Sequence, residues 1–109
     1  MLLRREANSA GMAKQINKGK DDERLVRLFG STSRPRILGL LLADTGKALY
    51  QREVMYETGL SLQAVQRELQ NLVTLGILKR EEIHARVYYQ IDPTSPLFKP
   101  LQQIYHLSD

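Results

Sequence analysis

The hydrophobic positions of this chain follow a helical period over most of its length after residue 21. Leucine, valine and phenylalanine recur on one side of the segment 22–30, which we predict to be a short helix ending at Gly30. The segment 33–43 (SRPRILGLLLA) has a serine that can cap it, a proline tolerated in the first turn, and leucine and isoleucine at helical spacing. This second segment is apolar enough to lie at the centre of the core.

Two further helices are predicted on either side of a glycine-containing turn. A short extended piece, 47–49, precedes QREVMYETG (51–59), which predicts a short helix ending at Gly59. In LSLQAVQRELQNLVTLG (60–76) a serine N-cap is followed by hydrophobic residues at spacings of three and four. This longer helix therefore has one apolar face, and its opposite face is polar.

A β-hairpin is predicted over residues 77–91, where isoleucine, valine and tyrosine flank a polar turn at His84 and Ala85. Tyr88 and Tyr89 are neighbours on the second strand, so one should face the core and the other the outside. The predicted hairpin has two strands.

The last segment, 96–107 (PLFKPLQQIYHL), predicts an amphipathic closing helix. A short helix, a turn, a longer helix and a hairpin, in this order, are typical of a winged helix-turn-helix, in which the second helix enters the major groove of DNA. We therefore predict a mostly helical α+β fold over residues 21–109, a winged helix-turn-helix with a two-stranded β-hairpin wing. Residues 1–20 are polar and basic with no sustained apolar period, and we predict a flexible arm there.

The polar face of the segment 60–76 carries side chains suited to reading base edges. A glutamine side chain can pair bidentately with adenine, and an arginine side chain with guanine. The candidate DNA-binding residues of this recognition helix are Gln63, Gln66, Arg67 and Gln70. On an isolated helix the same residues would more often form a solvated face, and it is the predicted architecture that favours DNA.

Further arginines are candidates for phosphate contacts, which position a protein on DNA without specifying sequence. They lie at the starts of predicted helices and on the predicted hairpin: Arg34, Arg36, Arg52, Arg80 and Arg86. Glu81 and Glu82 lie beside the hairpin arginines and weaken the case for such contacts. Exposed strand charges and ordinary surface salt bridges are the alternative interpretations.

The formal net charge of +4 lies entirely in residues 1–20, which hold five lysines and arginines and one glutamate. Residues 21–109 hold eleven basic and eleven acidic residues and are neutral. Net charge thus says little about the folded part, and the DNA hypothesis depends on where the arginines lie.

The composition argues against several classes of function. Without cysteine there is no disulfide, no thiolate metal site and no cysteine nucleophile. His84 and His106 have no carboxylate or cysteine at ligand spacing, and Gly46-Lys47 lacks the other residues of a phosphate-binding loop. We therefore predict no catalytic residue, no metal and no cofactor. No apolar run approaches the roughly 18 residues that cross a bilayer, so we expect a cytoplasmic protein with no membrane partner.

Three segments of the chain, LFGSTSRPRIL, LSLQAVQRELQNLVTLGILKR and VYYQIDP, resemble the ArsR-like winged-helix transcriptional regulators of bacteria and archaea. The likeness runs from about Leu25 to Leu107 and is closest to small winged-helix modules found alone or beside nucleotidyltransferase domains. The resemblance implies that Ala64 faces DNA with the four polar residues of the recognition helix, and that the wing ends near Arg86. Many ArsR-like regulators sense metals through cysteine, acidic or histidine ligands that this chain lacks, and Ala85 stands where a glycine is common.

The resemblance also implies a homodimer formed through the first and last helices. The apolar faces of these helices supply the candidate interface residues Leu25, Leu28, Phe29, Leu97, Phe98, Leu101, Ile104 and Tyr105. The leading hypothesis is sequence-specific binding of double-stranded DNA by a homodimeric transcriptional regulator that represses by occupying a promoter, with half-sites about 34 Å apart. Alternatives are a winged helix used for protein interaction or assembly with a separate protein partner, and a subunit acting with a separate nucleotidyltransferase.

Overall fold

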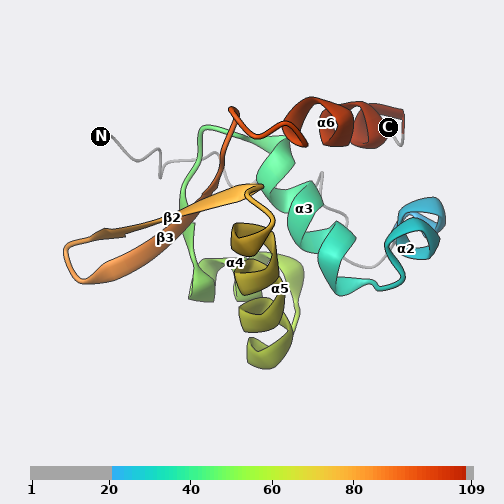
Figure 1. Cartoon of the computed structure of the whole chain (residues 1–109). Coiled ribbons are helices and arrows are strands. Elements are labelled where there is room, and N and C mark those ends of the chain that lie inside the picture. The colour runs from blue at the N-terminus through green and yellow to red at the C-terminus, as the bar shows by residue number, and fades with distance from the viewer. Residues whose placement is uncertain (1–20, 108–109) are drawn as a thin grey trace.

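The computed structural model describes residues 21–107, and the predicted arm over residues 1–20 lies outside this range. Within the described residues the fold is a small, mostly helical α+β arrangement of five helices and one three-stranded antiparallel sheet (Figure 1). The elements are α2 (Glu23–Phe29), α3 (Ser33–Ala43), β1 (Leu49–Tyr50), α4 (Gln51–Thr58), α5 (Leu62–Thr74), β2 (Leu78–Ile83), β3 (Arg86–Ile91) and α6 (Phe98–Leu107).

Helix α3 lies at the centre of the fold, as its apolar sequence predicts. It passes between α6 on one side and the α4–α5 pair on the other, and α2 packs near its start (Figure 1). Its side chains Ile37, Leu38 and Leu41 are fully buried, and they share one hydrophobic core with residues of α5 and the strands. Because a helix that is apolar on most sides must be covered on most sides, the other elements arrange themselves around α3.

The predicted helix boundaries are confirmed by the capping residues. The Asp22 side chain accepts a hydrogen bond from the Arg24 amide at the start of α2, and Gly30 ends that helix with φ of 72°. Gly59 ends α4 with φ of 74°, a left-handed conformation that glycine adopts without steric cost. Ser61 then caps α5 by accepting from the Ala64 amide at 3.1 Å.

The turn between α4 and α5 is fixed by one buried hydroxyl. Thr58 donates from its side chain to the Val54 carbonyl at 2.7 Å, and the same oxygen accepts from the Leu60 amide at 3.2 Å. These bonds hold the end of α4 and the residue before the Ser61 cap together. The orientation of α5 relative to α4 therefore follows from local hydrogen bonds as well as from core packing.

The sheet has one strand more than the sequence predicts. Leu49 and Tyr50 pair with Tyr89 and Tyr88, so that β1 adds to the β2–β3 hairpin in the order β1-β3-β2. The sequence predicted a two-stranded hairpin and a separate extended piece at 47–49. In the structure, Leu49 and Tyr50 instead form a third strand of the same sheet. The reason is that a two-residue strand gains its hydrogen bonds from a partner about 40 residues away, which no local pattern reports.

The expectation that one of the two adjacent tyrosines faces outward is only partly right. Tyr89 packs against the hydrophobic core, as expected for the inner position. Tyr88, on the opposite face of β3, is half-buried because its ring meets the ring of Tyr50 edge-on, with centroids 5.7 Å apart. The added strand therefore covers the tyrosine that should have been exposed.

The tip of the hairpin holds two residues in an unfavourable backbone conformation. Ile83 pairs with Arg86, so the turn consists of His84 and Ala85 alone, with φ of 52° and 62°. Two-residue hairpin turns of this kind require positive φ at both positions and are usually made by asparagine and glycine. The side chains at 84 and 85 thus impose a steric cost on the turn.

Ala85→Gly is expected to raise the free energy of unfolding by about 1 kcal/mol, because glycine removes the Cβ that disfavours the left-handed conformation. Urea denaturation followed by circular dichroism measures this change. As a matched control, Ala43→Gly at the end of α3 should destabilise, since glycine lowers helix propensity there. A neutral or destabilising effect of Ala85→Gly would contradict the positive φ of this turn.

Candidate nucleic-acid interface

Helix α5 presents one polar face to solvent. Gln63, Gln66, Arg67 and Gln70 are all exposed, and their spacing of three, four and seven places them on one side of the helix. The opposite side is anchored in the core through Val65, Leu69 and Leu72, all fully buried. The structure thus brings the four polar candidates together, with Ala64 half-buried beside them, whereas Leu62 and Leu75 at the ends of the apolar stripe are exposed.

An open groove is bounded by the start of α4, the start of α5 and the hairpin, and Leu62, the first residue of α5, is the α5 residue in its lining. The groove has a volume of about 700 Å³. Its lining residues are Tyr50, Gln51, Arg52, Met55, Leu62, Arg80, Ala85, Arg86, Val87 and Tyr89. Three of these are arginines and none is a carboxylate, so the groove is a site of local positive charge on a domain with no net charge.

The faces of the hairpin separate Arg80 from one of the neighbouring acids. Side chains alternate along a strand, and β2 pairs with β3 so that Arg80 lies opposite Tyr89 and Glu82 opposite Val87 on one face. Glu81 lies opposite Tyr88 on the other face. Arg80 therefore shares its face of the hairpin with Glu82 and not with Glu81, and neither glutamate is among the residues that line the groove.

Arg86, at the start of β3, is held by an aromatic ring that the sequence did not single out. Its guanidinium carbon lies 4.4 Å from the centroid of the Tyr50 ring, within the range of a cation–π contact. Tyr50 in turn meets Tyr88 edge-on. The three residues come together because β1 pairs with β3, so only the unpredicted strand could have identified Tyr50.

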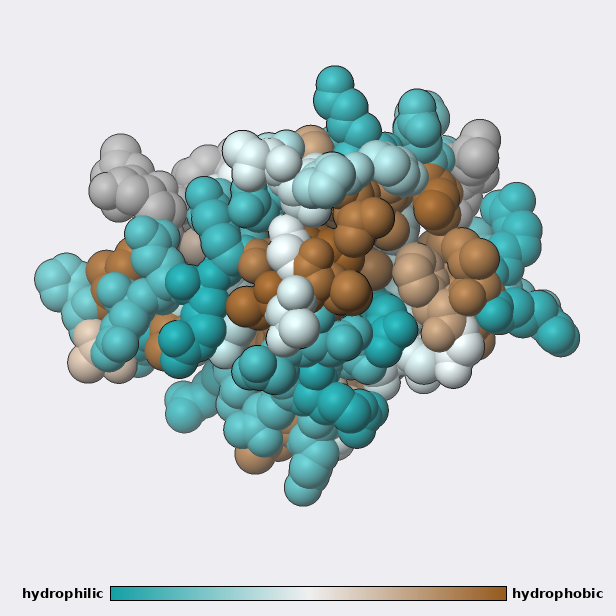
Figure 2. All heavy atoms as spheres, viewed as in Figure 1, coloured by the Kyte–Doolittle hydropathy of each residue, from teal (hydrophilic) through white to brown (hydrophobic). Residues whose placement is uncertain are grey.

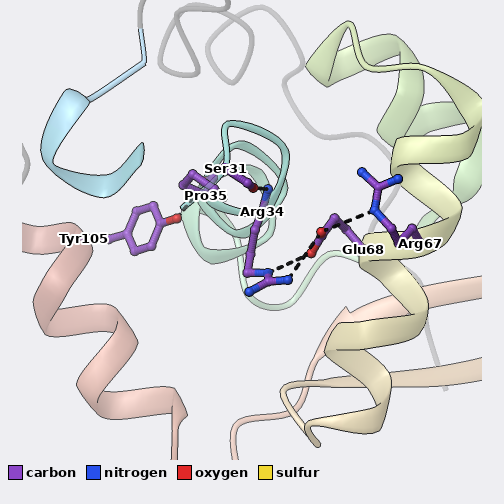
Figure 3. A network of polar contacts seen from close by, with 6 residues as sticks. All are labelled: Ser31, Arg34, Pro35, Arg67, Glu68 and Tyr105. Atoms are coloured by element: carbon purple, nitrogen blue, oxygen red, sulfur yellow. Dashed lines mark hydrogen bonds and ion pairs between the residues drawn. The ribbon is translucent and has the colours of Figure 1, made fainter. Parts of the chain in front are cut away.

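Arg34 and Arg36, at the start of α3, are engaged in ion pairs within the chain. Arg34 donates through Nε to Oε1 of Glu68 at 2.8 Å (Figure 3), and Arg36 donates through Nη2 to Asp21 at 2.7 Å and through Nη1 to the Thr58 carbonyl at 3.1 Å. The hydrogen bond to Asp21 raises the pKa of Arg36 above its ordinary value. Arg34 and Arg36 thus form salt bridges within the chain, which was the alternative to phosphate contacts. Arg52, in contrast, is exposed beside the groove.

Glu68 is the polar residue on the buried side of α5. Its side chain is only 5% exposed, and it also lies 3.9 Å from Nε of Arg67. The spacing analysis of α5 found the exposed glutamines but assigned no role to this buried carboxylate. A glutamate within an apolar period is itself a signal, since a buried carboxylate requires a cationic partner elsewhere in the chain.

The candidate interface residues on α2 and α6 divide into buried and accessible groups. Leu25 and Leu101 are buried within the chain itself and therefore serve the core rather than an exposed face. Leu28 is 63% exposed and Leu97 is 40% exposed. The remaining candidates are half-buried: Phe29, Phe98, Ile104 and Tyr105. Figure 2 shows hydrophobic residues gathered on the side of the molecule where Figure 1 places α2, α3 and α6.

Tyr105 joins α6 to α3. Its hydroxyl donates to the Pro35 carbonyl at 2.7 Å (Figure 3), and its ring lies against Gly39 at 3.3 Å from the position a Cβ would occupy. Burial raises the pKa of the Tyr105 hydroxyl, so the neutral donor form is favoured. Tyr105 therefore fixes the closing helix on the core, and only part of its surface is accessible to a partner.

No group of three or more histidine, cysteine, aspartate or glutamate side chains in residues 21–107 is arranged to hold a metal ion. None of the helices in this range combines the length and the apolar character needed to cross a bilayer.

Comparison of the chain with models of known protein families, with characterised proteins and with solved structures found no match. A functional proposal therefore depends on the residues and geometry of this chain.

Proposed function

We propose that the chain is a winged helix-turn-helix protein that binds double-stranded DNA sequence-specifically as a homodimer and represses transcription by occupying a promoter. One observation carries the proposal: the helix with the exposed polar face, α5, begins beside a groove with three arginines and no carboxylate among its lining residues. A DNA-binding surface needs hydrogen-bonding side chains for base edges and cations for phosphates next to one another. This chain supplies both on adjoining elements.

In the proposed complex, α5 enters the major groove and α4 lies across it, near the DNA backbone. Gln63, Gln66 and Gln70 then offer donors and acceptors to adenine, and Arg67 offers a bidentate contact to guanine. The groove arginines Arg52 and Arg80 meet phosphates, and the hairpin acts as the wing beside the neighbouring minor groove. Arg34 and Arg36 have no part in these contacts, because both are paired within the chain.

The proposed dimer forms through the apolar side of α2 and α6. Leu28 on α2 and Leu97 just before α6 are exposed there, and the half-buried Phe29 and Phe98 lie on the two helices. A chain of this size also gains stability by sharing apolar surface with a second copy. A two-fold dimer would place two α5 helices in successive major grooves, about 34 Å apart.

Arg67→Ala should weaken binding to the preferred site by about 1 to 3 kcal/mol per half-site, because each protomer of the dimer loses one bidentate base contact. Selection from a library of random duplexes first identifies that site for the full chain, and fluorescence anisotropy then measures affinity for it. Arg27→Ala is the matched control, since Arg27 is exposed on α2 and pairs with Glu23 one turn away. Equal effects of the two substitutions, or a library with no enriched sequence, would contradict the proposal.

A second candidate function is protein interaction or assembly, and the zero net charge of residues 21–109 favours it. Under this alternative the chain would enrich no sequence from the random library. Removal of base-reading side chains would then leave its binding to a protein partner unchanged.

A further inference from the structure

We propose that Glu68 is a positioning residue for Arg67. Arg34 fixes the Glu68 carboxylate, and this carboxylate orients the Arg67 guanidinium for base reading. This inference rests on the proposed DNA-binding function of α5. It assigns a role in recognition to two residues, Glu68 and Arg34, that do not themselves reach DNA.

Glu68 is held in one orientation by two contacts with the same arginine. Nε of Arg34 donates to Oε1 at 2.8 Å, and Nη2 of Arg34 lies 3.5 Å from Oε2 (Figure 3). A side-on guanidinium that meets both carboxylate oxygens fixes the plane of the carboxylate. The side chain is 5% exposed, so solvent does not compete strongly for these positions.

Arg67 lies on the outer side of the same carboxylate. Its Nε is 3.9 Å from Oε2 of Glu68, and its own side chain is 64% exposed. The three side chains form a row from α3 to the solvent-facing side of α5, Arg34, Glu68 and Arg67, as Figure 3 shows. At 3.9 Å the contact is an electrostatic attraction and not a close hydrogen bond, so it restricts the guanidinium without removing it from solvent.

This arrangement suits a base-reading arginine. A guanidinium has five N–H donors on distinct edges, and an attraction through Nε leaves the two terminal nitrogens for a partner. A long exposed arginine otherwise loses much rotamer freedom when it binds, which weakens binding. A carboxylate that already restricts the side chain in the free protein reduces that loss.

The Glu68 carboxylate also weakens DNA binding that has no sequence preference. Its negative charge lies 3.9 Å from Arg67 on the helix proposed to meet DNA, and a carboxylate there opposes the general attraction of DNA. Glu68 therefore favours specific over nonspecific binding in two ways, by orienting Arg67 and by weakening phosphate attraction. A residue that merely stabilised the fold would change both kinds of binding together.

The test compares Glu68→Gln with the unchanged full chain on two fluorescein-labelled duplexes, one with the sequence enriched by selection and one scrambled. Gln keeps an oxygen that accepts from Arg34 and removes the charge that attracts Arg67. The ratio of the two affinities should fall about tenfold, part of the range that one bidentate base contact supplies. Affinity for the scrambled duplex should stay equal or rise.

Two further variants separate positioning from folding. In an Arg67→Ala background, Glu68→Gln should change the ratio by less than about twofold, because the residue it positions is absent. Arg34→Lys, which keeps the charge but loses the side-on contact, should lower the ratio in the same direction as Glu68→Gln. An unchanged ratio in Glu68→Gln, or an equal fall with and without Arg67, would overturn the inference.

A measurement on the free protein keeps this inference distinct from the proposed function. The NMR order parameter of the Arg67 Nε–H group should be higher than that of the exposed Arg52, and should fall to the Arg52 level in Glu68→Gln. Order parameters of Arg67 that are equal in the two proteins would overturn the positioning role even if DNA binding is found. Failure of the selection to enrich a sequence would overturn the proposed function, and with it any role of this positioning in recognition.

Discussion

Arg34→Ala is expected to lower the free energy of unfolding by about 3 kcal/mol, because it leaves the Glu68 carboxylate buried without its close partner. The figure lies at the lower end for a buried pair, since the Arg34 side chain is 33% exposed and Glu68 is 5% exposed. Arg67 does not replace it, because its Nε remains 3.9 Å away. Urea denaturation of the variant and the unchanged chain measures the difference.

Replacement of both partners is the control for this prediction. Arg34→Met combined with Glu68→Leu removes the charge and its partner together, so the cost of an unpaired buried carboxylate disappears. The double variant should recover most of the stability lost in Arg34→Ala. A single variant that loses less than about 1 kcal/mol would contradict the burial and pairing of Glu68.

The helices of this fold were predictable because their signals are local. The boundaries of α2 and α4 follow from Gly30 and Gly59, which adopt positive φ after the last helical turn. The start of α5 follows from Ser61, and its exposed face follows from the period of its apolar residues. In each case the residues that determine the element lie within a few positions of it.

The contacts that organise the candidate site were not predictable because they join distant parts of the chain. Arg34 and Glu68 are 34 positions apart, and the sequence alone left a phosphate contact and a salt bridge as equal alternatives for Arg34. Tyr50 meets Tyr88 and Arg86 only because β1 joins the sheet. A two-residue strand has no period of its own, so its partner must be known before it can be recognised.

Glu68 illustrates how a residue can be visible in the sequence and still be overlooked. It lies between Val65 and Leu69 on the buried side of α5, where a helical period expects a hydrophobic residue. Such a position is tolerated only when a cation from another element neutralises it. The acidic residue in an otherwise apolar period thus indicated a buried ion pair. Its cationic partner is Arg34, at the start of α3.

The combined variant Arg52→Gln, Arg80→Gln and Arg86→Gln should have the largest effect on DNA binding. If each arginine meets one phosphate, the substitutions remove six contacts from the dimer, and the slope of log affinity against log salt should become shallower by about 5.4, since each contact contributes about 0.9. At about 0.15 M salt we expect affinity for both the selected and the scrambled duplex to fall by roughly a hundredfold or more. The ratio of the two affinities should change little, because phosphate contacts carry no sequence information. Fluorescence anisotropy over a salt series measures all three quantities.

A charge-matched variant distinguishes the groove from total positive charge as the source of DNA affinity. Arg24→Gln, Arg27→Gln and Lys99→Gln remove the same total charge from α2 and α6, which lie on the far side of α3 from the tip of the hairpin (Figure 1). This control should leave the salt slope within about 0.5 of the unchanged chain, because none of its cations adjoins the groove. Light scattering on both variants checks whether the oligomeric state is unchanged. If both sets weaken binding equally, affinity follows total charge, and the arginine groove is not where the DNA backbone lies.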